Sequence, residues 1–244
     1  MALVVILLLS MALALAMAPT IENMLSPMMG DTTDDYVCRH NYSMKIISHS
    51  PFIAYIDGFL QDREAEHIMS LAETRFTPSE TLNQTKTPKY RTSNSAVLNR
   101  SQTDIVRCIE ERTAQITGID MASLEYLQVV RYLPGQEYKK HTDYLDIDYL
   151  RTNYWGQFGQ RFATILAYLH EPVRGGNTSF SALGLSIPTK KNDAVYWMNM
   201  HANGTEDVRT THAGEPVEQG EKWAINLWAH RWNNAVRAMY TWQA

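Results

Sequence analysis

Residues 127–144 read LQVVRYLPGQEYKKHTDY, in which two runs of strand-forming residues flank a Pro-Gly turn. Similar runs follow at 161–169 (RFATILAYL), 193–200 (DAVYWMNM) and 222–228 (KWAINLW). Short runs rich in Val, Ile, Tyr, Thr and Trp, separated by Gly, Pro and Asn, are typical of strands. The second half of the chain is therefore predicted to fold as successive strands.

The first half has the pattern of helices. Residues 60–73 (LQDREAEHIMSLAE) place apolar side chains among charges, as an amphipathic helix does. A second helix is predicted at 102–116, opened by Ser101 and Asp104 at the spacing of a capping box and closed by Gly118. Helices followed by short strands predict an α+β fold with an antiparallel sandwich or barrel backed by helices, and the two-residue alternation is compatible with a jelly roll.

Length and charge limit the classes of function. The 244 residues are 45% hydrophobic, which favours one globular domain with a short appendage. The net charge of −4 comes without a long basic run. Binding to nucleic acid is therefore not expected.

The N-terminal residues have the composition of a targeting segment. Met1 to Met17 are almost wholly apolar, and no charge occurs before Glu22, as in a signal peptide or a short membrane anchor. Cleavage and retention both stay open, because no Lys or Arg precedes the apolar run whereas Ala16-Met17-Ala18 suits a cleavage site. If the segment functions, the chain enters the secretory pathway or the endoplasmic reticulum membrane; otherwise it is soluble.

The predicted organisation has three parts: a signal peptide or membrane anchor at 1–18, a linker at 19–50 and a folded domain at 51–244. Cys38 and Cys108 are the only cysteines. Their separation fits neither a zinc site nor a redox pair. A disulfide between them and two free thiols both remain open.

Three residues form a candidate metal site. His141 and Asp143 end the predicted strand 136–144, where positions i and i+2 project to the same face. With His212, they would make a 2-His-1-carboxylate facial triad, which leaves positions open on Fe(II). Taken alone, a His-x-Asp sequence also arises by chance, and a core or surface histidine beside an unrelated aspartate is the alternative.

Lys222 lies ten residues after His212 and begins an apolar strand. An ammonium group facing a pocket there could pair with the distal carboxylate of a dicarboxylate ligand. The alternative is a lysine at a strand end that reaches to water. Arg161, at the start of the strand 161–169, has the same two alternatives: a cation that faces the pocket or a strand-end side chain that reaches to water.

Beyond these residues, the sequence resembles the catalytic domain of the prolyl 4-hydroxylases, a family of Fe(II)- and 2-oxoglutarate-dependent dioxygenases. The resemblance implies a double-stranded β-helix (jelly-roll) core supported by N-terminal helices. It implies a compact monomer, because the long N-terminal region of the animal collagen enzymes is missing. The matching segments are 90–98 (YRTSNSAVL), 127–144, 161–169, 175–180 (GGNTSF) and 212–228 (HAGEPVEQGEKWAINLW).

The same resemblance assigns roles to individual residues. It makes His141, Asp143 and His212 the iron ligands, and Lys222 the partner of 2-oxoglutarate, with Tyr132 and Thr178 lining the cosubstrate site. Each residue also has a structural reading, since strand aromatics usually pack in a core and Glu125 with Arg161 could be a weak surface pair. The implied peptide contacts are Arg91, Ser93, Glu125, Tyr138, Arg161, Trp228 and His230.

The implied reaction is hydroxylation of peptidyl proline at C4 in a proline-rich or collagen-like peptide. It implies Fe(II) as cofactor, O2 and 2-oxoglutarate as cosubstrates, and ascorbate as reductant. The alternatives are a 2-oxoglutarate oxygenase acting on lysine or a small molecule, and an inactive module that binds proline-rich peptides. One departure from the family pattern is Asn192-Asp193, which stands where a glycine is usual. We expect it to affect a turn and not the chemistry.

Overall fold

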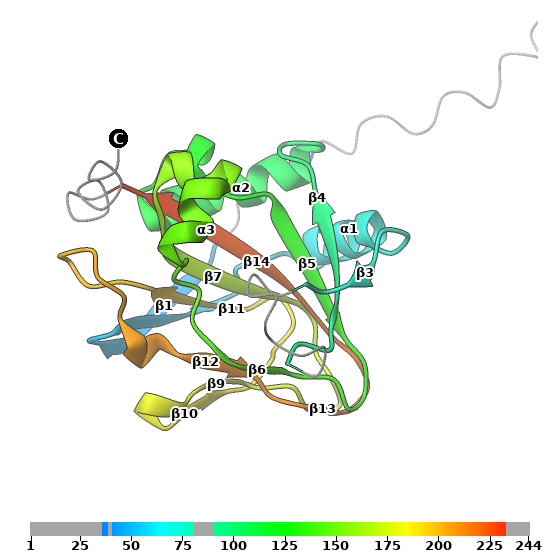
Figure 1. Ribbon diagram of the computed structural model, residues 1–244. Coiled ribbons are helices and arrows are strands. Elements are labelled where there is room, and N and C mark those ends of the chain that lie inside the picture. The colour runs from blue at the N-terminus through cyan, green and yellow to red at the C-terminus, as the bar shows by residue number, and fades with distance from the viewer. Residues whose placement is uncertain (1–35, 39–40, 81–89, 233–244) are drawn as a thin grey trace, which may run out of the picture. The chain divides into compact units, whose positions relative to one another are not determined.

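The structure is a computed structural model that describes residues 36–38, 41–80 and 90–232 (Figure 1). Two units are distinguished, Met1–Val37 and Cys38–Ala244, and everything below concerns the second. The predicted targeting segment 1–18 lies outside the described residues, as does most of the predicted linker. Within the described ranges, no helix is long and apolar enough to cross a membrane.

Two antiparallel sheets make up the core (Figure 1). A third, two-stranded ribbon pairs β13 (Val217–Gln219) with β8 (Arg174–Gly175). The small sheet has the order β10 (Leu185–Ile187), β9 (Thr178–Phe180), β12 (His212–Gly214) and β6 (Tyr138–His141). The large sheet has the order β1 (Ser43–His49), β2 (Phe52–Asp57), β11 (Ala194–Met198), β7 (Gln160–His170), β14 (Lys222–Arg231), β5 (Leu127–Tyr132), β4 (Asn94–Leu98) and β3 (Thr77–Pro78).

A tight turn carries the chain from one sheet to the other. Pro134 and Gly135 connect β5 to β6, and the Gln136 amide donates to the Leu133 carbonyl at 2.9 Å. Gly135 has φ +83°, the left-handed conformation that a type II turn requires at this position. The Pro-Gly pair read from the sequence therefore marks the crossing between the sheets.

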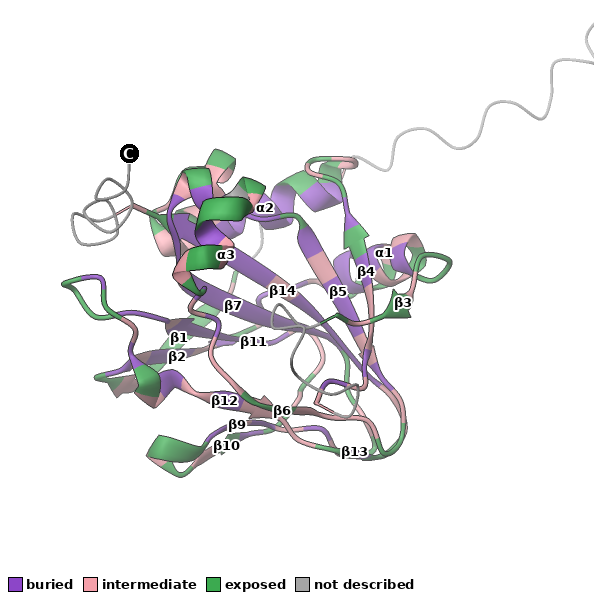
Figure 2. Ribbon diagram, in the orientation of Figure 1, coloured by how far each residue is buried: buried purple, intermediate pink, exposed green. Residues whose placement is uncertain are grey.

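The central strands are buried on both faces, as Figure 2 shows for β7, β14 and β5. On β7, Leu166 and Tyr168 belong to the apolar cluster between the sheets. Ile165, Ala167 and Leu169, which alternate with them, are fully buried as well. The outer face is covered by helices, since α1 (Asp62–Ala72) contacts β7 and α2 (Asp104–Thr117) contacts β14. A strand covered on both sides reads as the continuous apolar run seen in the sequence.

The predicted helices are confirmed, with one correction at a terminus. Gly118 ends α2 in the left-handed conformation, with φ +67°. The N-cap of α2 is Thr103 and not Ser101: the Thr103 hydroxyl accepts from the Val106 amide. Ser101 instead donates its hydroxyl to buried Glu110 at 2.8 Å, so it serves the core rather than the helix end. A short third helix, α3 (Ile147–Thr152), was not predicted.

Two sequence-based boundaries also differ from the structure. The sheet begins at Ser43 and not near residue 50, because β1 pairs with β2. The strand predicted at 136–144 is shorter, 138–141, so Asp143 lies in the bend after β6. Of the two alternatives for the cysteines, the structure has the disulfide: Cys38 and Cys108 are bonded to each other.

A buried ion pair joins the two long helices. Both Arg112 guanidinium nitrogens donate to the Glu64 carboxylate, at 2.9 and 2.7 Å, and Arg112 also donates to the Phe59 carbonyl at 2.6 Å. Glu64 is fully buried and Arg112 is 5% exposed. A buried carboxylate without its partner costs several kcal/mol, so each charge depends on the other.

We predict that Arg112→Met lowers the free energy of unfolding by about 3–5 kcal/mol, because the buried Glu64 carboxylate loses its cationic partner. Urea unfolding followed by circular dichroism measures the free energy of unfolding of each variant. The matched control on the same helix is Arg107→Met: Arg107 pairs with Asp104 at 2.8 Å, but both side chains are more than half exposed, so the loss is about 0–1 kcal/mol. Equal losses in the two variants would contradict the prediction.

Candidate active site

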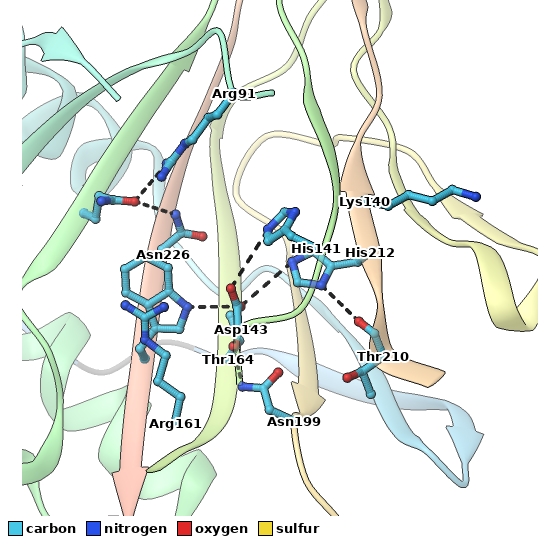
Figure 3. A network of polar contacts seen from close by, with 12 residues as sticks. Arg91, Lys140, His141, Asp143, Arg161, Thr164, Asn199, Thr210, His212 and Asn226 are labelled. Atoms are coloured by element: carbon cyan, nitrogen blue, oxygen red, sulfur yellow. Dashed lines mark hydrogen bonds and ion pairs between the residues drawn. The ribbon is translucent and has the colours of Figure 1, made fainter. Parts of the chain in front are cut away.

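His141, Asp143 and His212 come together at the edge of the small sheet (Figure 3). The pairing of β6 with β12 sets His212 directly opposite His141, and their ring centroids are 4.2 Å apart. Asp143 follows β6 by two residues. The three ligand atoms lie within 4.8 Å of one another, the one such group of His, Cys, Asp or Glu side chains in the described part of the chain.

The hydrogen bonds of the two histidines leave one nitrogen of each available. His141 Nδ1 lies 2.8 Å from the Lys139 carbonyl, and His212 Nδ1 lies 3.0 Å from the Thr210 carbonyl. Because a carbonyl oxygen only accepts, each Nδ1 carries a proton, and Nε2 is the nitrogen that remains for another partner. The Nε2 atoms are 4.0 and 3.9 Å from Asp143 oxygens, too far for a hydrogen bond. Histidines held in this way are typical metal ligands.

The charge states also suit a metal. Burial lowers the pKa of His141 well below its ordinary value, and the neighbouring His212 lowers it further. Burial alone would raise the pKa of Asp143, but the nearby imidazoles and the Arg161 guanidinium outweigh burial and hold that pKa at about 2. A neutral imidazole and an ionised carboxylate are the forms that bind a divalent cation.

A pocket of about 670 Å³ opens over these three residues, and Lys222 lies in its wall. Lys222 is 2% exposed, and its ammonium donates to the Gly176 carbonyl at 2.6 Å and to the Thr178 hydroxyl at 3.4 Å. Burial lowers the pKa of Lys222 to about 7. No described acidic side chain lies within 4 Å of its ammonium. The Glu215 carboxylate acts on the lysine from beyond that distance and raises its pKa, but less than burial lowers it. A buried cation outside any ion pair is suited to an anionic ligand.

A second wall of the pocket contains a stacked group of side chains. Tyr138 lies over His141, with ring centroids 3.5 Å apart, and the Arg91 guanidinium lies 4.7 Å from the centre of the Tyr138 ring. Arg91 is held in turn by hydrogen bonds to Ser93 at 3.1 Å and to Gln128 at 3.0 Å. Tyr138 is therefore fixed between the Arg91 guanidinium and the His141 imidazole.

The third wall contains Arg161 and Trp228. The guanidinium carbon of Arg161 is 3.7 Å from the centre of a Trp228 ring. Two Arg161 nitrogens donate to the Glu125 carboxylate at 2.5 and 2.9 Å, and His230 Nε2 lies 2.6 Å from the same carboxylate. Glu125 is 8% exposed, so the pair with Arg161 is buried and not the weak surface pair considered above.

The structure thus separates the predicted site residues into two groups. Ser93, Glu125 and His230 are buried but are not among the pocket-lining residues. Ser93 contacts Arg91, Glu125 contacts Arg161, and His230 contacts Glu125. The remaining predicted residues all line the pocket: Arg91, Tyr132, Tyr138, His141, Asp143, Arg161, Thr178, His212, Lys222 and Trp228.

Two buried polar residues near Asp143 were not predicted. Thr164 and Asn199 are 0% and 1% exposed, and they connect to the Asp143 carboxylate by hydrogen bonds (Figure 3). Each is a polar residue within a strongly apolar run, RFATILAYL or DAVYWMNM. That interruption is the signal that sequence reasoning could have used.

The departure at Asn192 lies in a turn before β11, as expected. Asn192 has φ +74°, a conformation that glycine adopts freely and that asparagine tolerates better than most residues. Its side-chain amide donates to Asp62 at 2.9 Å. Asp193 accepts from the Gly58 amide at 2.8 Å. Neither residue lines the pocket.

Comparisons with known proteins point to one group of enzymes. A model of the 2OG-Fe(II) oxygenase superfamily matches residues 127–230. The human prolyl 4-hydroxylase subunit alpha-3 is 36% identical over 206 residues, which are 83% of this chain but 38% of that protein, so the chain spans about two fifths of this relative's length. Prolyl 4-hydroxylase 5 of Arabidopsis thaliana is 33% identical over 77% of this chain and 71% of its own length.

A solved structure is similar as well. The viral collagen prolyl hydroxylase of Paramecium bursaria Chlorella virus-1, in its complex with 2OG, superposes with a TM-score of 0.60 at 28% identity. The match covers 74% of this chain and 96% of that one. The jelly-roll fold implied by the sequence is thereby confirmed.

We predict that Lys222 makes stability rise with pH. Folding lowers the pKa of this lysine from 10.5 to about 7, so between these values the unfolded chain binds more protons at this position than the folded chain. The free energy of unfolding then increases with pH, by up to about 1.4 kcal/mol per unit. Below about pH 7 both states are protonated, and the cost of the buried charge is present in full.

Urea unfolding at several pH values between about 7 and 9 tests this prediction. Lys222→Met lacks the titrating group, so its advantage over the wild type should shrink as the pH rises. Lys45→Met, which removes an exposed lysine of β1, should run parallel to the wild type. A constant difference between the wild type and Lys222→Met over the whole range would contradict the lowered pKa.

Proposed function

The chain belongs to the prolyl 4-hydroxylase family of 2OG-Fe(II) oxygenases, and from this membership we propose that it hydroxylates peptidyl proline at C4 with Fe(II), O2 and 2-oxoglutarate. One observation carries the proposal: the two-histidine, one-carboxylate group shares a single pocket with a buried lysine that has no acidic side chain within 4 Å among the described residues. The first set suits a metal, and the second suits a dicarboxylate.

His141, Asp143 and His212 would hold Fe(II). Their donor set of two imidazoles and one carboxylate fits a non-haem iron. When bound, Fe(II) would supply the oxidising chemistry, with 2-oxoglutarate converted to succinate and CO2. The chain contributes a fixed donor set, since both imidazoles are oriented by backbone carbonyls.

Lys222 would orient 2-oxoglutarate through its distal carboxylate. The ammonium is already directed by the Gly176 carbonyl and the Thr178 hydroxyl, so little reorganisation is needed when the anion binds. Tyr132 and Thr178 line the same part of the pocket. Bound carboxylate would also favour the protonated lysine, which burial alone disfavours.

The peptide would bind across the walls formed by Arg91, Tyr138, Arg161 and Trp228. These side chains are held by hydrogen bonds, stacking or ion pairs before any substrate arrives, which lowers the entropic cost of binding. Proline-rich chains adopt an extended polyproline II helix in advance. The groove and the peptide would therefore both be ordered before they bind. Ascorbate would act as reductant, as in the family.

The Cys38–Cys108 disulfide supports a place in the secretory pathway, because disulfides persist in oxidising compartments. Residues 1–18, as a signal peptide or membrane anchor, would provide entry. This part of the proposal is tested by expressing the full chain with a C-terminal tag and locating it by cell fractionation.

We predict that purified protein with Fe(II), 2-oxoglutarate and a proline-rich or collagen-like peptide releases succinate and adds one oxygen to proline. Mass spectrometry of the peptide and a succinate assay measure the two products together. His212→Ala should abolish both, since it removes a metal ligand. Succinate formed without peptide oxidation, or oxygen added to lysine or to a small molecule, would refute proline as the substrate.

We further predict that Lys222→Met raises the KM for 2-oxoglutarate by about 10–100-fold, which corresponds to the loss of a charged hydrogen bond of about 1.5–3 kcal/mol. The KM for peptide should change little. Lys45→Met, on the surface of β1, serves as the control and should leave both constants unchanged. An unaltered KM for 2-oxoglutarate in Lys222→Met would exclude this lysine as the carboxylate partner.

A further inference from the structure

The carboxylate of Asp143 is held on one side only. Its Oδ2 accepts two hydrogen bonds, from the Thr164 hydroxyl at 2.8 Å and from the Trp228 indole at 3.0 Å. No described donor contacts Oδ1 within hydrogen-bond distance. The two oxygens therefore differ in their protein donors, although both face the metal-binding histidines: Oδ1 lies 4.0 Å from His141 Nε2 and Oδ2 lies 3.9 Å from His212 Nε2.

Asp143 needs such support more than the histidines do. His141 and His212 lie on paired strands, where the ladder fixes their backbones. Asp143 lies in the bend after β6, outside any ladder. Its carboxylate can be oriented only by side chains that reach it, and in the described structure these come from the large sheet.

The direction of the Thr164 hydrogen bond is set by Asn199. The Asn199 side-chain amide donates to the Thr164 hydroxyl at 2.9 Å (Figure 3). A hydroxyl has one proton, so a hydroxyl that accepts from Asn199 directs its own proton to Asp143. The backbone of Asn199 is fixed as well: its amide donates to the Phe162 carbonyl at 2.9 Å, and its carbonyl accepts from the Asp207 amide at 3.1 Å.

Neither Thr164 nor Asn199 lines the pocket, so neither contacts a substrate there. Both are fully buried among apolar strand residues, where an unpaired polar group costs about 1–3 kcal/mol. A valine at 164 would fill the same space on β7 without this cost. The hydrogen bond to Asp143 is the function that the hydroxyl adds.

We propose that Thr164 and Asn199 are positioning residues for the metal ligand Asp143. They hold Oδ2, together with Trp228, so that the carboxylate is fixed facing the two imidazoles. A carboxylate oriented in advance by hydrogen bonds needs little reorganisation when an ion binds. The inference rests on the proposed metal site.

Thr164→Val tests the proposal, because valine has the shape of threonine without the hydroxyl. Co(II) serves as the probe: its affinity is measured by competition with a chelating dye, and its visible absorption reports the ligand geometry. Loss of a partner that orients a metal ligand weakens binding by about 10–100-fold. We expect Thr164→Val to show this loss and an altered Co(II) spectrum, and Thr164→Ser, which restores a hydroxyl, to resemble the wild type.

The matched control is Thr113→Val. Thr113 is also fully buried, and its hydroxyl donates to the Ile109 carbonyl within α2 at 2.8 Å. This variant should bind Co(II) as the wild type does, which separates a lost hydroxyl from general destabilisation. If Thr164→Val does not fold, Asn199→Leu provides the test: it removes the donor that directs the Thr164 proton, and a smaller loss of Co(II) affinity is expected.

Wild-type affinity and an unchanged spectrum in the folded Thr164→Val variant, or in Asn199→Leu, would overturn the positioning proposal. His212→Ala distinguishes this outcome from failure of the metal site itself. If His212→Ala loses Co(II) while Thr164→Val keeps it, only the positioning proposal fails. If His212→Ala binds Co(II) as tightly as the wild type, the proposed metal site fails and the positioning proposal fails with it.

Discussion

The pairing of β6 with β12 is the constraint on which the pocket depends. Its register sets His141 opposite His212, and the pairing of β12 with β9 then sets Thr178 opposite Gly214. Because side chains alternate along a strand, a slip of one residue would turn His212 away from the pocket. The other pocket residues are placed relative to this register. Lys222 belongs to the large sheet, where it lies opposite Tyr132 in the pairing of β14 with β5.

Around that frame, the charges in the pocket are stabilised in two different ways. Arg161 is neutralised by Glu125, which in turn contacts His230, so its charge is balanced within the protein. Lys222 donates to neutral acceptors, a carbonyl and a hydroxyl, and burial lowers its pKa to about 7. A balanced cation can shape a wall, whereas an unbalanced one is suited to binding a charged ligand.

Much of this organisation could be predicted from the sequence, because strand periodicity and the pair His141 and Asp143 are local signals, and the resemblance to one family joined them to His212 and Lys222. The structure brings these residues together in one pocket. Contacts between distant segments could not be predicted in the same way. The buried pair of Arg112 with Glu64 and the position of Glu125 behind Arg161 depend on how elements pack, and Thr164 is hidden within an apolar run. The N-cap of α2 is Thr103 and not the predicted Ser101, because the Ser101 hydroxyl donates to Glu110 instead.

The first strand has a consequence for association between molecules. β1 lies at an end of the large sheet, and its exposed residues include Met44 and Ile46, so its outer edge offers backbone groups and apolar side chains together. Such edges template the addition of strands from other chains. The register of β1 shifts between Ile46 and Ser48, and Lys45 is exposed on the same strand. An irregular edge that carries a charge is a poor template for such strand addition.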